Sequence, residues 1–550
     1  MKLSRKDYEF NNTRICHIMP KHVELDRVMI NLYMLIKHNG RRPVAKTGRI
    51  DVTIDYIVKE LIDQHGDKLK GFRDYPDVVG DWVYSDLVDI VYRGISGKET
   101  VAAPLPLHLN AYKLRNPKQS ADYRGSEHLF SMLKAGDPTL PRRLATFLGQ
   151  GMDAAYDTYD ESTPLDLDTL AIVRMVDNRH LEEKPSSTGS TLDEPLCFGQ
   201  ARLLSSDLRR LLAYENRIPR SVLIGYIRSA LGLHLGLYLL RLFHQLTGWV
   251  QDKGANPSCL NCPVRPNEQS NLFAECPYAY QNVQATANNV VPEILVDMGE
   301  DYTSHMAQLS RENCARHYGI VNDYIRAVFI VNQLFRYVGS YAGRVVLPSQ
   351  PQSIANTLEI LAHPPQKFDL YFGQLIDTIA PDDQEEREEV KAIKDMQGLS
   401  PLETFIELVA LERTRYYRKY LTEQIDSVLM KNRDTCLVRQ GKGRRNERRW
   451  HIGSRMLEML VQIAVLESTE GTLESNFRSR PILIDQFITW LKQRYGLVLM
   501  PEWPEATIQD YEAFNSNLQH LKNRLREIGF YTDLSDAYNA QTIRPRYEIG

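Results

Sequence analysis

The apolar residues of this chain recur mostly three or four positions apart. The pattern is clear over Val23–Lys37 and Ile54–Leu61, and it dominates the strongly apolar region from Leu203 to Tyr341. This spacing lines apolar side chains along one face of a helix. It therefore predicts a mainly α-helical protein.

One long helix is also marked by its first residues. Ser400 has a side chain that can cap a helix, Pro401 suits the first turn, and Glu403 completes a capping box. The apolar positions that follow predict a helix that runs to about Met430. We interpret the acidic residues just before it, between 380 and 395, as a solvated loop or helix start.

Polar and turn-forming stretches divide the chain. Thr100–Asn116 contains two prolines and is predicted to be irregular, and Glu182–Glu194 is the best candidate for a flexible loop. These breaks predict a multidomain chain. Its expected parts are an N-terminal, mainly helical domain at 1–185, a helical core domain at 195–380 with a cysteine-rich segment at 257–317, a connecting helix at 396–430, a basic linker at 431–449 and a C-terminal domain at 450–550.

The composition is that of an ordinary folded protein. Of 550 residues, 43% are hydrophobic and 25% are charged, and the length favours several domains over one core. The formal net charge is −3. Any nucleic-acid site must therefore rest on a local basic patch and not on the charge of the whole chain.

The sequence offers little sign of a membrane or of export. The N-terminus lacks the apolar run of a secretory signal, so we expect a cytoplasmic protein. The most apolar stretch, Val222–Val250, contains Arg228, His234, Arg241 and His244, which are costly in a lipid bilayer. It is therefore predicted to be a buried core helix and not a membrane span.

The cysteines form the strongest chemical signal. Four of the seven lie between residues 259 and 314, and the first two form a CxxC turn, which brings two thiolates to one cation. Thiolates favour Zn²⁺ or an iron–sulfur cluster. We predict a structural zinc site, with an iron–sulfur cluster as the alternative. The expected ligands are Cys259, Cys262, Cys276 and Cys314, and His317 or His305 could replace Cys314.

A basic run leads into the last hundred residues. Residues 431–449 hold eight basic side chains against two acidic ones, and arginine, which dominates, is well shaped for phosphate contact. Helical spacing then returns over Gly453–Leu466, Ile482–Tyr495 and Tyr511–Ile528. The tail from Phe530 alternates enough to form a β-hairpin.

Three helices followed by a hairpin is the order of a winged helix. The segment from Arg494 to Tyr547 resembles winged-helix domains of larger prokaryotic proteins, and the resemblance covers about residues 450–550. It implies a third helix in the DNA major groove and a wing on the backbone. With the basic run, the predicted DNA contacts are Arg439, Lys442, Arg444, Arg445, Arg448, Arg449, Asn517, His520, Lys522, Arg524, Arg544 and Arg546.

The whole chain also resembles the large helical proteins of prokaryotic anti-phage defence gene clusters. Common catalytic motifs are absent, because the sequence has no GxxxxGK[ST], HExxH, GxSxG or GxGxxG. We predict a non-catalytic DNA-binding subunit of a multiprotein system, with other protein subunits as partners and no small-molecule substrate. The alternatives are a scaffold whose winged helix binds protein, and a nucleic-acid-processing enzyme whose site converges only in space.

Overall fold

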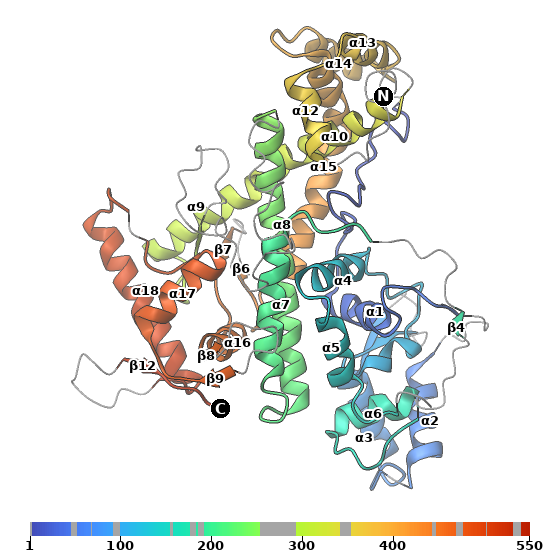
Figure 1. The fold of residues 1–550 in the computed structure, drawn as a ribbon, viewed down its shortest axis with the longest axis vertical. Helices are drawn as coiled ribbons and strands as arrows, with labels where there is room; N and C mark the ends of the chain where they lie inside the picture. Colours follow the sequence, from blue (N-terminus) through green and yellow to red (C-terminus); the bar gives the residue numbers. More distant parts are fainter. Residues whose placement is uncertain are drawn as a thin grey trace.

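The computed structural model describes residues 3–45, 52–67, 69–91, 100–153, 158–176, 183–184, 192–253, 293–340, 354–442, 447–468, 477–501, 503–531 and 541–550. Within these ranges the protein is mainly helical, as its apolar spacing predicts, and its short strands associate in pairs (Figure 1).

The N-terminal part combines short helices with two small antiparallel strand pairs. Its order is α1 (Leu25–Lys37), β1 (Val44–Ala45), α2 (Ile54–His65), α3 (Pro76–Trp82), a π-helix (Val83–Leu87), β2 (Val88–Val91), β3 (Thr100–Pro104), a 3-10 helix (Leu109–Leu114), α4 (Gly125–Gly136), α5 (Leu140–Leu148), α6 (Leu167–Val176) and β4 (Glu183–Lys184). β1 pairs with β4 and β2 with β3. A hydrophobic cluster of its own joins α2, α3, α6 and the β2–β3 pair.

The centre of the molecule is α8 (Arg220–Gln251), flanked by α7 (Phe198–Leu212), α10 (Val321–Gly339) and α15 (Pro401–Val428) (Figure 1). Of the helices in the described ranges, α8 alone has the length and apolar composition that could cross a membrane. Its most apolar window is 83% buried inside the protein, which is the environment of the predicted core helix. Gly232 permits a close crossing, because a Cβ atom there would lie 2.7 Å from the carbonyl oxygen of Val428.

The remaining helices of the body are α9 (His305–Gly319), α12 (Ile354–Ala362), α13 (Phe368–Asp377) and α14 (Gln384–Lys394). The last three gather around α10 and α15 at one end of the molecule (Figure 1). α14 contains the acidic stretch, and the Asp383 side chain caps it by accepting a hydrogen bond from the Glu386 amide. The acidic residues therefore begin a solvated helix, as predicted.

The C-terminal part alternates short strands with α16 (Ser454–Ala464), α17 (Ile484–Tyr495) and α18 (Ile508–Glu527). Two antiparallel hairpins are β6 (Val438–Gln440) with β7 (Arg448–Trp450) and β8 (Leu466–Ser468) with β9 (Phe477–Ser479). β10 (Ile482–Leu483) pairs antiparallel with β12 (Thr542–Ile543). β11 (Leu497–Val498) pairs in parallel with β5 (Ile294–Leu295), so a strand from the middle of the chain is built into this part.

The largest hydrophobic cluster is shared by most of the chain. It extends from Phe10 to Ile543 and includes side chains of α1, α8, α10, α15, α16 and α17. This core crosses the expected boundaries near residues 185–195, 380–396 and 430–450. Residues 438–440 of the expected linker pair with residues 448–450, at its end, as β6 and β7.

Several predicted elements can be compared directly. The helices over Val23–Lys37 and Ile54–Leu61 are confirmed as α1 and α2, and the capping box of Ser400 and Glu403 begins α15, which ends at Val428. The irregular structure predicted for Thr100–Asn116 is wrong in large part, because this stretch contains β3 and the 3-10 helix. Pro104 ends β3, which is an edge strand because the sheet has two strands, and edge strands tolerate proline.

Candidate nucleic-acid interface

α18 is the third of the predicted C-terminal helices and begins at a well-formed cap. The Thr507 side chain accepts from the Asp510 amide, and the Asp510 carboxylate accepts from Thr507 in return. Phe514, Leu521 and Leu525 are buried, and α18 packs against α9. Asp510 also accepts from His305 of α9 at 2.7 Å, which lowers its pKa to about 2. One face of α18 is thus fixed on the body.

Asn517 lies on this buried face. Its Oδ1 accepts from the Met298 amide at 2.7 Å, and its Nδ2 donates to the carbonyls of Val296 and Leu499 at 2.9 and 3.0 Å. The side chain is fully buried. Contact with a base would break these three hydrogen bonds, so the structure gives Asn517 the role of joining α18 to the segments after β5 and β11, and not that of a predicted DNA contact.

An acidic loop after β5 brings several predicted basic residues together. Glu300 forms ion pairs with Arg439 of β6, at 2.5 Å, and with Arg524 of α18. Glu300 is largely exposed, while both arginines are mostly covered. The loop therefore neutralises two of the predicted cations and ties the β6–β7 hairpin to α18.

The same loop holds Arg449 in the interior. The Arg449 guanidinium is fully buried, pairs with Asp297, and donates to the Gly299 carbonyl at 3.0 Å. The Tyr302 ring lies 3.9 Å from its centre, a cation–π distance. Burial raises the pKa of Asp297, although Arg449 opposes this shift. Arg449 therefore stabilises the junction and is covered from any ligand.

Arg448 faces the other side of the hairpin. Its guanidinium makes two hydrogen bonds of 2.7 Å to Asp426 of α15, the bidentate geometry typical of arginine and carboxylate. Lys431 donates to the same carboxylate at 2.6 Å. This end of the basic run is therefore attached to α15.

The tail contributes two exposed arginines, of which Arg546 is engaged in contacts of its side chain. Arg546 pairs with Glu458 of α16, donates to the Ile528 carbonyl, and lies 4.5 Å from the Phe530 ring centre. Arg544 is exposed, and its amide donates to the Phe530 carbonyl at 3.1 Å. The hairpin predicted for the tail has its tip at residues 532–540, outside the described ranges.

Of the twelve predicted contacts, Lys442, Lys522 and Arg544 form no ion pair with any described residue. Lys442 and Arg544 are exposed and Lys522 is half-buried. His520 is exposed beside Gly299. Arg444 and Arg445 lie outside the described residues. The structure therefore divides the predicted set into buried or paired residues and a smaller set with available charge.

Sequence reasoning missed the acidic loop that organises this region. Asp297, Glu300 and Asp301 place three carboxylates within five residues, directly after β5. That local charge was the available signal. Which cations these carboxylates contact depends on the β5–β11 pairing. That pairing joins segments about 200 residues apart in sequence, so the spacing of apolar residues within one segment does not predict it.

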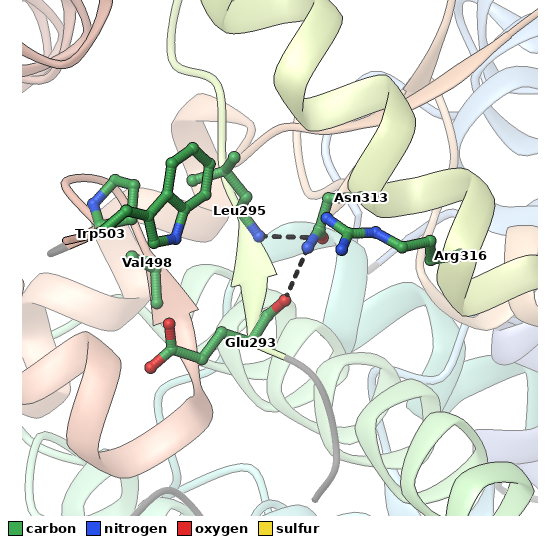
Figure 2. Close-up of a pocket in the computed structure, with 7 residues that line it drawn as sticks. Glu293, Leu295, Asn313, Arg316, Val498 and Trp503 are labelled. Carbon is green, nitrogen blue, oxygen red and sulfur yellow. Dashed lines mark hydrogen bonds between the residues drawn. The ribbon is translucent and has the colours of Figure 1, made fainter. Parts of the chain in front are cut away.

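A small pocket lies beside this junction, between β5, β11 and α9 (Figure 2). Its volume is about 230 Å³, and it is lined by Glu293, Leu295, Asn313, Arg316, Val498, Pro501 and Trp503. Asn313 accepts from the Leu295 amide at 3.1 Å and donates to the Glu293 carbonyl at 3.0 Å. The pocket is therefore formed where α9 is fixed to β5.

Three of the four predicted zinc ligands, Cys259, Cys262 and Cys276, lie outside the described residues. Cys314 of α9 is buried, and burial raises the pKa of its thiol. In the parts of the chain that the structure describes, no group of three or more His, Cys, Asp or Glu side chains is arranged to hold a metal ion.

Two histidine rings, one from α8 and one from α9, lie close together. His317 of α9 is buried and His244 of α8 is half-buried, and their ring centroids lie 5.4 Å apart. His317 Nδ1 and His244 Nε2 have no hydrogen-bond partner among the described residues. His305, in contrast, is bound to Asp510. The alternative ligand His317 therefore has a nitrogen available, whereas His305 is engaged.

Comparison with known proteins gives one match. No curated protein and no solved structure matches the chain. A family model described as "Methylation-associated defense system protein MAD7" matches residues 5–547. The match spans the N-terminal part, the α8-centred body and the C-terminal part alike, and it agrees with the resemblance to defence-cluster proteins. The chain belongs to the MAD7 family of methylation-associated defence system proteins.

Proposed function

We propose that this protein is a non-catalytic, cytoplasmic subunit of an anti-phage defence system and that it binds DNA through its C-terminal part. Membership of a defence-system family supports a role beside other protein components. The observation that carries the DNA proposal is the set of cations Lys442, Lys522 and Arg544, which pair with no described carboxylate, on a unit with the order of a winged helix.

The order of elements supports the winged-helix assignment. α16, α17 and α18 correspond to its three helices, and β10, before α17, pairs with β12, after α18. The Arg544 amide bonds to the Phe530 carbonyl on the other side of the tail, which would make Phe530 and Arg544 the base of a wing. β8 and β9 are an addition to that order.

Charge reversal at these three cations tests DNA binding. We expect Lys442→Glu, Lys522→Glu and Arg544→Glu together to weaken binding to a duplex by about tenfold or more, and to reduce the salt dependence, because each phosphate contact contributes about 0.9 to the slope. Fluorescence anisotropy over a salt series measures both. A matched control reverses the exposed Lys59, Lys367 and Lys391 instead.

The control should bind as the unmodified protein does. Equal losses of affinity in both triple variants would mean that only the net charge of the protein matters. No affinity of the unmodified protein for duplex DNA at low salt would rule out the DNA proposal. In that case the scaffold reading leads, and one observation favours it: Ile508 and Tyr511 at the start of α18 are 80% and 56% exposed. Exposed apolar side chains of this size are typical of protein contacts.

We also propose a structural zinc site with Cys259, Cys262 and Cys276 as ligands and Cys314 or His317 completing it. The support is the donor set, together with the Nδ1 nitrogen of buried His317, which has no hydrogen-bond partner among the described residues. Such a site would hold together the segment between α8 and β5.

Metal analysis of protein purified without chelator tests this site. We expect about one zinc per chain and no visible absorption, and Cys259→Ser with Cys262→Ser should remove the zinc. Cys314→Ser and His317→Ala, measured separately, identify the fourth ligand by which one loses metal. Cys197→Ser is the control, because Cys197 is a buried free cysteine that is not among the predicted ligands. Zinc far below one equivalent without a chromophore contradicts both metal hypotheses.

A further inference from the structure

A second surface with the chemistry of a nucleic-acid site lies on α15. Between Arg413 and Tyr420 this helix carries four cations, three tyrosines and no carboxylate. Arg415, Arg418 and Lys419 are exposed and form no ion pair with any described residue. The arginines around the acidic loop after β5 are paired with carboxylates, whereas these three cations of α15 have no such partner among the described residues.

The tyrosines hold a further cation from a distant segment. Lys21 of the N-terminal segment lies 4.1 Å from the Tyr420 ring centre and 4.9 Å from that of Tyr416. Its ammonium also donates to the Tyr416 hydroxyl at 2.5 Å. Contact with aromatic rings orients a cation without cancelling its charge. Lys21 is therefore fixed in place and still positive.

The adjoining loop adds the Tyr123 ring, which is also exposed, at a strained position of the backbone. Tyr123 and Arg124 both have positive φ, at 46° and 66°, a region that costs free energy for residues other than glycine. The Tyr123 carbonyl accepts from the Met19 amide at 2.9 Å, which sets this loop against the Lys21 segment. Tyr123 is 36% exposed and Tyr416 is 42% exposed. Strain at consecutive residues that present a ring to solvent indicates a functional position.

We propose that Lys21, Tyr123, Arg415, Tyr416, Lys419 and Tyr420 form a binding surface for single-stranded nucleic acid. Cations bind the phosphates and exposed rings stack on bases, a combination that requires unpaired bases because those of a duplex have no free face. An acidic peptide would use the cations alone and would leave the tyrosines without a role.

This surface is separate from the C-terminal interface. α15 and α18 lie on either side of α8 in Figure 1. The proposal does not depend on DNA binding by the C-terminal part, and the two can fail independently. The triple variant of Lys442, Lys522 and Arg544 tests the C-terminal interface on duplex DNA, while variants on α15 test this surface on single strands.

Fluorescence anisotropy with labelled oligo-dT and oligo-U at low salt tests the proposal in the full chain. We expect Arg415→Glu with Lys419→Glu to weaken binding to one or both oligomers roughly tenfold, and Tyr123→Ala with Tyr416→Ala to weaken it by a similar factor through lost stacking. Tyr416→Phe keeps the ring and should bind normally. The controls are Lys367→Glu with Lys391→Glu for charge and exposed Tyr75→Ala for an aromatic ring.

Thermal melting of each variant shows whether the fold is kept. If the Tyr123→Ala, Tyr416→Ala pair does not fold, the Arg415→Glu, Lys419→Glu variant still tests the proposal, with Tyr416→Phe as the variant expected to bind normally. Affinity for both oligomers within threefold of the unmodified protein in the charge variant would overturn the proposal. So would equal losses in the control variants, or polyglutamate competing as well as oligo-dT, which would assign the surface to acidic protein.

Discussion

Replacing Asp207 by asparagine is expected to destabilise the protein by about 3–5 kcal/mol, because it leaves a buried guanidinium without its counter-charge. Asp207 of α7 is fully buried and accepts from Arg494 at 2.5 and 3.0 Å, from Tyr495 at 2.6 Å and from His234 at 2.8 Å. Arg494 and Tyr495 end α17, so this carboxylate joins the C-terminal part to the α7–α8 body. Chemical denaturation followed by circular dichroism measures the loss.

The effect of this substitution should depend on pH. Burial by itself would raise the pKa of Asp207, but Arg494 and the hydrogen bond from His234 outweigh it and hold that pKa well below its usual value. A lowered folded-state pKa contributes stability above the unfolded value, about 3.9, and loses it as the pH falls. The difference between the unmodified protein and the variant should therefore be full at pH 7 and shrink below about pH 4.

An exposed ion pair provides the matched control. Glu467 and Arg480 lie 3.1 Å apart with about half of each side chain exposed. Glu467→Gln should change stability by less than about 1 kcal/mol, as is usual for exposed pairs. If Asp207→Asn costs no more than Glu467→Gln at pH 7, the Asp207 network does not join α7 to α17 energetically.

Arg449→Met is expected to have the second large effect, also about 3–5 kcal/mol at neutral pH. The change keeps much of the side-chain volume but leaves Asp297 buried without its cation. Arg449 and Asp297 are both almost fully buried. DNA affinity of the folded variant should stay unchanged, because Arg449 is covered. A specific loss of duplex binding without loss of stability would restore Arg449 as a DNA contact.

The contribution of the Asp297 carboxyl group to stability has the opposite pH dependence from that of Asp207, although both variants should be less harmful in acid. Burial raises the pKa of Asp297 despite the opposing Arg449, so its contribution is fully present below the unfolded pKa and is lost as the pH rises through the folded pKa. Without Arg449 this loss should grow, which makes Arg449→Met least harmful in acid. Adding Asp297→Asn should recover most of the stability at pH 7. Urea midpoints of the two single variants and the double variant measure the coupling.

Local sequence signals predicted individual helices well. The capping box at Ser400, the left-handed Gly496 that ends α17 and the apolar spacing of α1 each depend on residues within one or two turns. The buried course of α8 also followed from its composition, since charged and histidine side chains can be paired in a protein core but not in lipid. In these cases the information lies within the element itself.

The site residues were harder to predict because charge alone does not say whether a side chain is available. Arg439, Arg448 and Arg524 were predicted as DNA contacts, yet each faces a carboxylate from another segment. Asn517 has the residue type of a base contact, but it lies on the inner face of its helix. The Lys21 surface was missed because its members come from three distant segments.

By itself the sequence determined the helical class, the limits of the main helices, the run of three C-terminal helices and the cysteine spacing that favours zinc. The tertiary structure alone decided which cations remain unpaired. It did so through the β5–β11 pairing, which carries Asp297 and Glu300 into contact with Arg449, Arg439 and Arg524. Helix formation depends on neighbours in sequence, whereas ion pairing depends on neighbours in space.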